Sequence, residues 1–311
     1  MIAITGPTAS GKSALAVEYA ASVGGEVVSV DSRQIYRGLD VGTAKPTADE
    51  RRRVPHHLID EADPSEPLSA GAYAQLVNDR IDEVLARGAV PVLAGGSTLY
   101  LDAVVHGIAD LEVPGADGAV SADELASPEA RERLYAELAN ADPDAAATLD
   151  TTKTQRLSRL VGILRATGRP PSAIWAEAPP PRHAIDVVVL DRPRQELYDR
   201  IDRRVDQMLA DGLVEENRRL LALGLRLDRP PLRTIGYAEV IDHLEGRIDE
   251  AEMVRLIKRN TRRYAKRQLT WFRRKDYTWL SPADATVERL AQTDRKSSRP
   301  APTHPTPTAR P

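Results

Sequence analysis

A short stretch near the start of the sequence has the residue types and spacing of a phosphate-binding loop. Residues 6–13 are a glycine, four further residues, and then glycine, lysine and serine. In such a loop backbone N–H groups at a helix start converge on phosphate oxygens, the lysine adds positive charge and the hydroxyl can hold Mg²⁺. We therefore predict a diphosphate-binding loop, the cradle, with Ser13 as the metal ligand; its residues are Gly6, Pro7, Thr8, Ala9, Ser10, Gly11, Lys12 and Ser13.

A carboxylate is expected to face this cradle. Residues 2–5 form a short apolar run and residues 14–20 favour a helix, so the cradle joins a strand to a helix. A second apolar run, 26–30, delivers Asp31 at its carboxyl end. Ligands of open parallel sheets bind beyond the carboxyl ends of the strands, so Asp31 is a candidate general base or magnesium ligand. The alternative is that Asp31 only caps the turn at residues 32–34.

The remaining elements that would position these residues alternate between strands and helices. Helical spacing of apolar residues covers 69–87, a buried strand covers 89–94, and a second strand-to-helix junction follows at 95–100. Apolar residues 185–190 predict another strand. A helix is expected at 195–213, a second short helix follows it and ends at 223, and a long helix is expected at about 249–273. This order predicts an α/β fold, a P-loop-type parallel sheet core flanked by helices, with an inserted small all-helical lobe.

The predicted domain limits follow changes in composition. Residues 1–113 are expected to form the first part of the core and 183–283 its second part, which includes an arginine-rich helix. Residues 114–182 are rich in alanine and acidic residues without a strong strand signal, and they predict the helical insertion. Residues 284–311, which end in a Pro-, Thr- and Ala-rich run, are expected to be a disordered tail.

Composition excludes several classes of protein. The 311 residues include no cysteine, which excludes disulfides, thiolate metal sites and cysteine nucleophiles. No apolar run approaches the length needed to cross a bilayer, and the first residues lack the pattern of a secretory signal. The sequence therefore predicts an unexported protein of the reducing cytoplasm.

Positive charge is concentrated near the end of the chain. Residues 253–275 contain ten basic side chains and no acidic one, although the net charge of the chain is −3. Seven of them recur at helical spacing and define a basic stripe: Arg255, Lys258, Arg259, Arg262, Arg263, Lys266 and Arg267. Basic faces normally interleave acids at i+4, and none occurs within this stripe. We predict phosphate-backbone binding through Arg259 and Arg263; the alternative is a solvated face.

Longer segments resemble the tRNA dimethylallyltransferases, also called tRNA isopentenyltransferases. Members of this family place a five-carbon prenyl group on the N6 amine of an adenosine beside the anticodon. The resemblance covers residues 2 to about 280 in the family's order, and the block 31–46 is more specific than the cradle. The matching segments are residues 6–13, 31–46, 55–60, 95–100, 155–157, 233–237 and 265–271.

The resemblance implies a substrate pair and roles for particular residues. It implies dimethylallyl diphosphate in the cradle, Mg²⁺ as cofactor, tRNA (its anticodon stem-loop) as partner, and a protein that works as a monomer away from membranes. The implied catalytic residues are Asp31, Lys12, Arg233 and Ser97. The implied tRNA-binding residues are Asp31, Ser32, Arg33, Gln34, Ser97, Gln155, Arg156, Leu157, Ser158 and Arg159.

The sequence departs from the family at two places and leaves other functions open. Ser97 stands where the family usually has threonine, and residues 149–154 replace a His-Pro-rich approach to Gln155 in an insertion shorter than is common. One alternative is a prenyltransferase for free adenine nucleotides, which would not need the basic stripe. A P-loop small-molecule kinase would not need the block 31–46. A non-catalytic RNA-binding protein would not need Lys12, Ser13 and Asp31.

Overall fold

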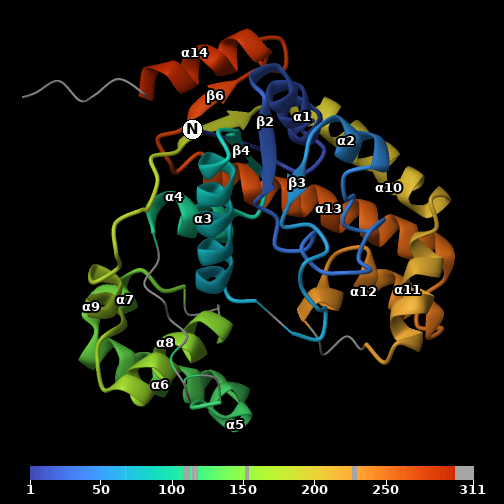
Figure 1. The fold of residues 1–311 in the computed structure, drawn as a ribbon. Coiled ribbons are helices and arrows are strands. Elements are labelled where there is room, and N and C mark those ends of the chain that lie inside the picture. Colours follow the sequence, from blue (N-terminus) through green and yellow to red (C-terminus); the bar gives the residue numbers. More distant parts are fainter. Residues whose placement is uncertain are drawn as a thin grey trace, which may run out of the picture. The chain divides into compact units, whose positions relative to one another are not determined.

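The computed structural model describes residues 1–66, 68–107, 113, 116, 118–150, 154–225 and 230–297 of the chain. These residues form two compact units (Figure 1). The first takes its residues from 1–67, 76–101 and 183–311, and the second from 68–75 and 102–182. The second unit therefore begins earlier than the predicted limit of 114 and includes a separate short piece of the chain.

A six-stranded parallel sheet forms the centre of the first unit, which confirms the predicted α/β fold. The strands lie in the order β3-β2-β4-β1-β5-β6, and every described pair is parallel. The short strands are mostly buried, as expected of apolar runs covered on both faces. Their bounds are β1 Ile2–Thr5, β2 Gly25–Ser29, β3 His56–His57, β4 Val90–Gly95, β5 Asp186–Leu190 and β6 Thr278–Leu280.

Helix α1 (Lys12–Val23) links the cradle to the sheet. The helix begins inside the cradle and ends at Gly24, whose φ of 62° is the left-handed conformation that glycine adopts without strain. Its buried face, including Leu15 and Tyr19, packs in one cluster with β1, β2, β4 and β5. The orientation of the first turn of α1 is therefore fixed by the core of the sheet.

Part of the predicted disordered tail is instead a helix. Helix α14 (Val287–Ser297) contacts α1, β1 and β5, and Leu290 is completely buried in the core. Asp294 accepts a hydrogen bond from the Tyr19 hydroxyl at 3.0 Å and pairs with the amino group of Met1 at 3.2 Å. The prediction of disorder was therefore wrong for residues 287–297, because the composition of the far end masked one buried leucine; residues 298–311 lie outside the described part.

Four helices of the first unit pack into a bundle beside the sheet (Figure 1). They are α10 (Arg194–Ala210), α11 (Leu213–Ala222), α12 (Tyr237–Leu244) and α13 (Glu250–Phe272). Val205, Leu213, Val240, Met253 and Ile257 form their shared core. The 3₁₀ helix η1 (Pro230–Arg233) precedes α12, and the small helix α2 (Ala48–Arg53) precedes β3.

The buried carboxylate of Glu216 anchors the loop before α2 to this bundle. It accepts hydrogen bonds from the backbone N–H groups of Asp40, Val41 and Gly42 at 2.7–3.1 Å and from the Tyr237 hydroxyl at 2.7 Å. A side chain at Gly42 would lie 2.5 Å from the Tyr237 ring. The turn at residues 40–42 therefore serves a packing constraint as well as any chemistry of the block 31–46.

The described residues of the second unit form helices and no strand, as predicted for the insertion. Leu134, Leu138, Leu157, Leu160 and Val161 lie in its core. Its helices are α5 (Ala122–Ala126), α6 (Pro128–Ala141), α7 (Pro143–Ala147), α8 (Thr154–Thr167) and α9 (Pro171–Ala176). Helices α3 (Ala70–Ala86) and α4 (Thr98–His106) contribute residues to both units. Within the described ranges, no helix combines the length and apolar character needed to cross a membrane.

The ion pair between Glu26 of β2 and Arg87 allows a test of the contribution of this contact to stability. The carboxylate of Glu26 accepts hydrogen bonds from Nε and Nη2 of Arg87 and contacts His57. The pKa of Glu26 is lowered to about 2, chiefly by the hydrogen bonds from Arg87. Because this folded-state pKa lies below the unfolded value of about 4.3, the stabilisation is present above about pH 5 and is lost as the pH falls toward 2.

We expect Glu26→Gln to lower the free energy of unfolding at pH 7 by about 1–3 kcal/mol, because a charged hydrogen-bond acceptor is lost. The variant should also lose less stability than the wild type between pH 5 and pH 2. Urea unfolding at a series of pH values measures both effects. Glu83→Gln, at an exposed carboxylate paired with Arg80, is the control and should change little. Parallel pH profiles for Glu26→Gln and the wild type would contradict the assignment.

Candidate active site

The cradle turns sharply between β1 and α1. Gly6, Ala9 and Gly11 have φ values of 147°, 64° and 98°, and the N–H of Ser10 donates to the carbonyl of Pro7 at 3.1 Å. A Cβ atom at Gly11 would lie 3.3 Å from Arg192 Nη2 and 3.6 Å from Arg200 Nη2. The predicted pattern therefore forms the expected loop, and the backbone conformation at position 11, with a φ of 98°, favours glycine.

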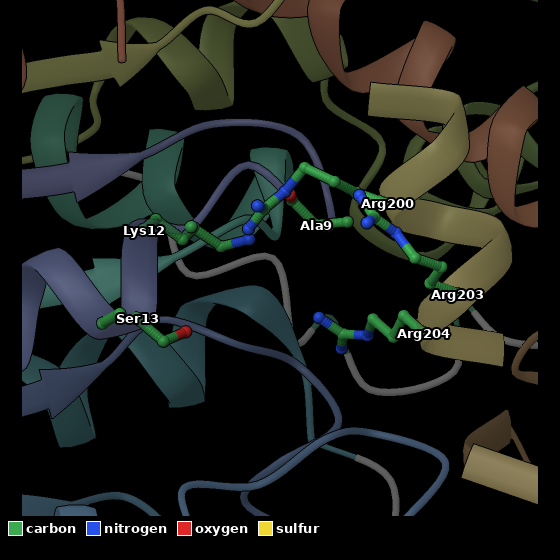
Figure 2. A pocket seen from close by; sticks show the side chains of 8 residues that line it. Ala9, Lys12, Ser13, Arg200, Arg203 and Arg204 are labelled. Carbon is green, nitrogen blue, oxygen red and sulfur yellow. The ribbon is translucent and has the colours of Figure 1, made fainter. Parts of the chain in front are cut away.

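Arginines from another part of the chain hold and face the cradle. Arg200 Nε donates to the carbonyl of Ala9 at 2.8 Å, and Arg192 Nε donates to the carbonyl of Ser10 at 2.5 Å. Figure 2 shows Lys12 and Ser13 on one side of a cavity and Arg203 and Arg204 projecting from α10 on the other. The cavity has a volume of about 360 Å³ and is lined by Ala9, Gly11, Lys12, Ser13, Ala14, Arg200, Arg203 and Arg204.

These arginines were missed by the sequence analysis, which predicted a helix at 195–213 and gave its basic residues no role. The apolar side of α10 does pack, with Leu197, Ile201 and Val205 buried. The available signal was the spacing of Arg200, Arg203 and Arg204, which follows i, i+3, i+4 and places the three side chains on one helical face. Nothing in the local sequence shows that this face lies against the cradle.

Lys12 is held in an environment that disfavours its charge. Burial, and to a smaller extent the nearby Arg204 guanidinium, lower the pKa of its ammonium group to about 8, and Asp31 opposes both effects. Burial also lowers the pKa of Arg204, and Asp31 again opposes the shift. Two like charges therefore face one cavity with a carboxylate nearby, which is an arrangement that a bound anion would stabilise.

Asp31 and Ser97 are brought together by the two loops that follow β2 and β4. Asp31 Oδ1 accepts hydrogen bonds from the N–H groups of Arg33 at 2.9 Å and Gln34 at 3.4 Å, so the turn-capping interpretation is also correct. Ser97 Oγ accepts from the Ser32 N–H at 2.9 Å and donates to Ser32 Oγ at 3.2 Å. Of the predicted tRNA-binding residues, Asp31, Ser32, Arg33, Gln34 and Ser97 therefore form one cluster.

A tyrosine from α13 also lies in the electrostatic environment of Asp31. Burial raises the pKa of Tyr264 to about 12, and the negative charge of Asp31 contributes to the shift in the same direction. The Tyr264 hydroxyl is therefore neutral over the physiological pH range. The sequence analysis gave Tyr264 no role.

Arg233 lines a different cavity from the cradle. It is exposed in η1, and it lines a cavity of about 310 Å³ with Ile235, Ala238, Glu239, Asn260, Arg263 and Arg267. The structure thus places Arg204, and not Arg233, with Lys12 and Ser13 in the cavity at the cradle. The predicted catalytic role of Arg233 remains a prediction.

The basic stripe is divided by acidic residues outside it. Arg255 pairs with Glu252, and Lys258 and Arg262 pair with Asp206 and Asp202 of α10. In contrast, Arg263 and Arg267 are exposed beside Arg233, and Arg259 Nε donates to Asn260 Oδ1 at 3.2 Å. Three of the seven basic side chains are therefore paired with acids: Glu252 precedes the stripe on α13 itself, and α10 supplies Asp202 and Asp206. The predicted binding of a phosphate backbone stays a prediction.

The other predicted tRNA-binding residues lie in the second unit on α8. Gln155 and Arg156 are exposed, and Ser158 and Arg159 are partly buried. Leu157 is completely buried in the core of that unit. The side chain of Leu157 is therefore occupied by apolar contacts, and the predicted tRNA binding at this position stays a prediction.

The described residues contain no group of three or more His, Asp or Glu side chains that would hold a metal ion. The Ser13 hydroxyl points into the cavity at the cradle (Figure 2). Magnesium commonly binds through few protein ligands together with substrate phosphates and water. Ser13 is thus a suitable donor for a metal that arrives with a diphosphate, and the donor set is unsuited to a metal bound by protein alone.

Comparisons with known proteins give a consistent result. The model of the family described as IPP transferase matches residues 34–275. A Salinibacter ruber protein named tRNA dimethylallyltransferase is 51% identical over 297 residues, which is 94% of this chain and 91% of that protein. The structure of the full-length tRNA isopentenylpyrophosphate transferase from Bacillus halodurans is 38% identical, with a TM-score of 0.70 over 96% of this chain and 97% of that one. A eukaryotic dimethylallyltransferase acting on tRNA has a TM-score of 0.80 at 25% identity, over 97% of this chain and 81% of that one.

The lowered pKa of Lys12 predicts how anion binding depends on pH. Lys12 loses its proton as the pH rises through about 8, so the affinity for inorganic diphosphate should fall above that pH. The fall should approach tenfold for each further pH unit. Lys12→Arg keeps its charge throughout, so the ratio of wild-type to variant affinity, measured by calorimetry at each pH, removes the titration of diphosphate itself. A constant ratio up to pH 9.5 would contradict the assignment.

Proposed function

This chain belongs to the IPP transferase family, and we propose that it transfers a dimethylallyl group from dimethylallyl diphosphate to N6 of an adenosine next to the anticodon of tRNA, releasing diphosphate. The observation that carries the proposal is the placement of Lys12 and Arg204 at a phosphate-binding loop, within electrostatic reach of Asp31. The cations suit a leaving diphosphate, and the carboxylate suits an amine that must lose a proton.

The cradle would stabilise the leaving group. Breaking the allylic C–O bond moves an electron pair onto a diphosphate oxygen, so negative charge grows where the cradle N–H groups, Lys12 and Arg204 converge. These donors are held in place before reaction by α1 and α10, and their interaction with the anion strengthens in the transition state. Arg200 and Arg192 support the cradle through its carbonyl groups.

Asp31 would act as the general base. The N6 amine of adenine is a weak nucleophile because its lone pair is delocalised into the ring, and it becomes acidic as the new C–N bond forms. Asp31 accepts the released proton, a contribution of about a hundred- to ten-thousand-fold in rate. The hydrogen bonds from the N–H groups of Arg33 and Gln34 to Oδ1 fix the carboxylate. Ser97 Oγ is hydrogen-bonded to the neighbouring residue Ser32 and would orient the same amine.

Magnesium is the proposed cofactor. The Ser13 hydroxyl would hold the ion next to the cradle, where the remaining ligands are diphosphate oxygens and water. When bound, the ion supplies positive charge that neutralises part of the diphosphate. The protein is proposed to act as a monomer in the cytoplasm, with tRNA as its macromolecular substrate.

A direct assay tests the function. The wild-type protein is incubated with unmodified tRNA, dimethylallyl diphosphate and Mg²⁺, and the nucleosides are then analysed by mass spectrometry. We expect one prenylated adenosine per tRNA and release of diphosphate. Prenylation of free AMP without reaction on tRNA would replace the proposal by the nucleotide-specific alternative. Magnesium-dependent ATP turnover without any prenyl transfer would replace it by the kinase alternative.

The position of Arg204 predicts a large effect on the chemical step. Arg204→Ala should lower the single-turnover rate with bound tRNA by about 10²–10³-fold, because one preorganised donor to the leaving group is lost. Arg233→Ala, which changes an exposed residue lining the other cavity, should lower that rate less than tenfold. An equal loss of the single-turnover rate in the two variants would support the catalytic role of Arg233 that the resemblance implies.

The division of the basic stripe predicts which arginines bind RNA. Arg259→Glu with Arg263→Glu should weaken binding of all tRNAs alike and reduce the slope of log affinity against log salt by about one to two units. The matched control is Arg255→Glu with Lys258→Glu, which changes net charge equally at side chains already paired with acids. Filter binding across a salt series measures both the affinity and the slope. If the two double variants have indistinguishable slopes, the distinction between acid-paired and other arginines of the stripe is contradicted.

A further inference from the structure

One buried glutamine on the basic helix α13 joins two loops of the active site. Gln268 is 3% exposed. Its Oε1 accepts a hydrogen bond from the N–H of Thr8 in the cradle at 2.9 Å, and its Nε2 donates to the carbonyl of Gly96 at 2.7 Å. One amide side chain therefore satisfies a donor in the cradle and an acceptor in the loop that leads to Ser97.

These two loops leave the sheet from neighbouring strands. Strands β1 and β4 pair in parallel with Thr5 opposite Gly95, and Thr5 Oγ1 donates to the Gly95 carbonyl at 2.7 Å. The regular pairing of the two strands ends at Thr5 and Gly95. The cradle begins at the residue after β1, and Gly96 is the residue after β4. Gln268 thus continues the connection between the two chains beyond the end of the sheet.

The space around Gly96 leaves little freedom to this contact. A Cβ atom at Gly96 would lie 2.7 Å from Gln268 Nε2, 3.2 Å from the carbonyl oxygen of Gly6 and 3.3 Å from Lys12 Cε. The glutamine amide, the cradle backbone and the stem of Lys12 therefore crowd one backbone position. A shift of the amide would be transmitted to Lys12 and to the loop carrying Ser97.

We propose that Gln268 is a positioning residue that sets the separation between the diphosphate cradle and the Ser97–Asp31 cluster. This inference rests on the proposed prenyl transfer, in which the cradle holds the donor and the cluster holds the acceptor amine. Ser97 is connected to the acceptor cluster through its hydrogen bonds with Ser32. The amide of Gln268 acts on both halves of the site without touching the reacting atoms.

Such a role affects the reaction more than binding. Reacting atoms must approach to about 3–3.5 Å, and a misplacement of about 1 Å costs on the order of a hundredfold in rate. Each substrate, in contrast, is held by its own loop, so its affinity depends little on the distance between the loops. A residue needed only for folding would change stability and leave the rate of the folded fraction intact.

The first experiment compares Gln268→Ala with a destabilised control on the same helix. We expect Gln268→Ala to lower the single-turnover rate with saturating substrates about ten- to hundredfold, while the affinities for inorganic diphosphate and for tRNA each change less than about threefold. Met253→Ala, which removes a side chain that is 1% exposed in the helix bundle, should lower the melting temperature without slowing the reaction of folded protein. A rate of Gln268→Ala equal to that of Met253→Ala would overturn the proposal.

The second experiment is a double-mutant cycle with Gly96→Ala. In the wild-type background the new methyl group collides with the Gln268 amide and should slow the reaction at least tenfold. In the Gln268→Ala background the severe contact at 2.7 Å is gone and only the milder contacts with Gly6 and Lys12 remain, so the same change should add less than threefold. If Gly96→Ala lowers the rate by the same factor in both backgrounds, the two substitutions act independently and the proposal is overturned. A wild-type protein that transfers no prenyl group would overturn the proposed function as well, whereas a fully active Gln268→Ala would overturn this inference alone.

Discussion

The repulsion between Lys12 and Arg204 is the constraint on which the site depends. Burial and the neighbouring guanidinium lower the pKa of Lys12 to about 8, so the protein holds two cations at one cavity at a cost in stability. The nearby carboxylate of Asp31 compensates only in part. An anion placed between the two cations removes the repulsion, and an anion that gains charge as it leaves gains the most from them. The arrangement therefore supports the proposed role of the site in stabilising a leaving diphosphate.

The fold maintains this repulsive arrangement by fixing α10 from both sides. On its face toward the cradle, Arg200 donates to the carbonyl of Ala9 and Arg204 projects into the cavity (Figure 2). On the other face, Asp202 and Asp206 pair with Arg262 and Lys258 of α13. Exposed pairs of this kind stabilise little individually, but they fix the rotation of α10 about its axis. That rotation determines whether Arg204 faces the cradle.

The sequence allowed prediction of those parts of the site whose geometry is local. The cradle follows from the spacing of Gly6, Gly11, Lys12 and Ser13, and Asp31 follows from its place at the end of a strand. Arg204 was not predicted, because its role depends on the packing of α10 against a loop about 190 residues away. Asp202 and Asp206, which pair with two members of the basic stripe, were missed for the same reason. In α14, a single buried leucine was hidden by the composition of the residues beyond it.

Helix α13 joins the two chemical tasks of the protein along one element. Its exposed Arg263 and Arg267 face solvent beside Arg233, while Tyr264 lies within the field of Asp31 and Gln268 bonds to the cradle. These four side chains lie within six consecutive residues, so less than two helical turns separate the positive surface from the donor site. If the proposed function holds, a phosphate backbone bound by Arg263 and Arg267 would be placed relative to the cradle by the stiffness of this one helix. Gln268 is a residue through which the helix contacts the cradle.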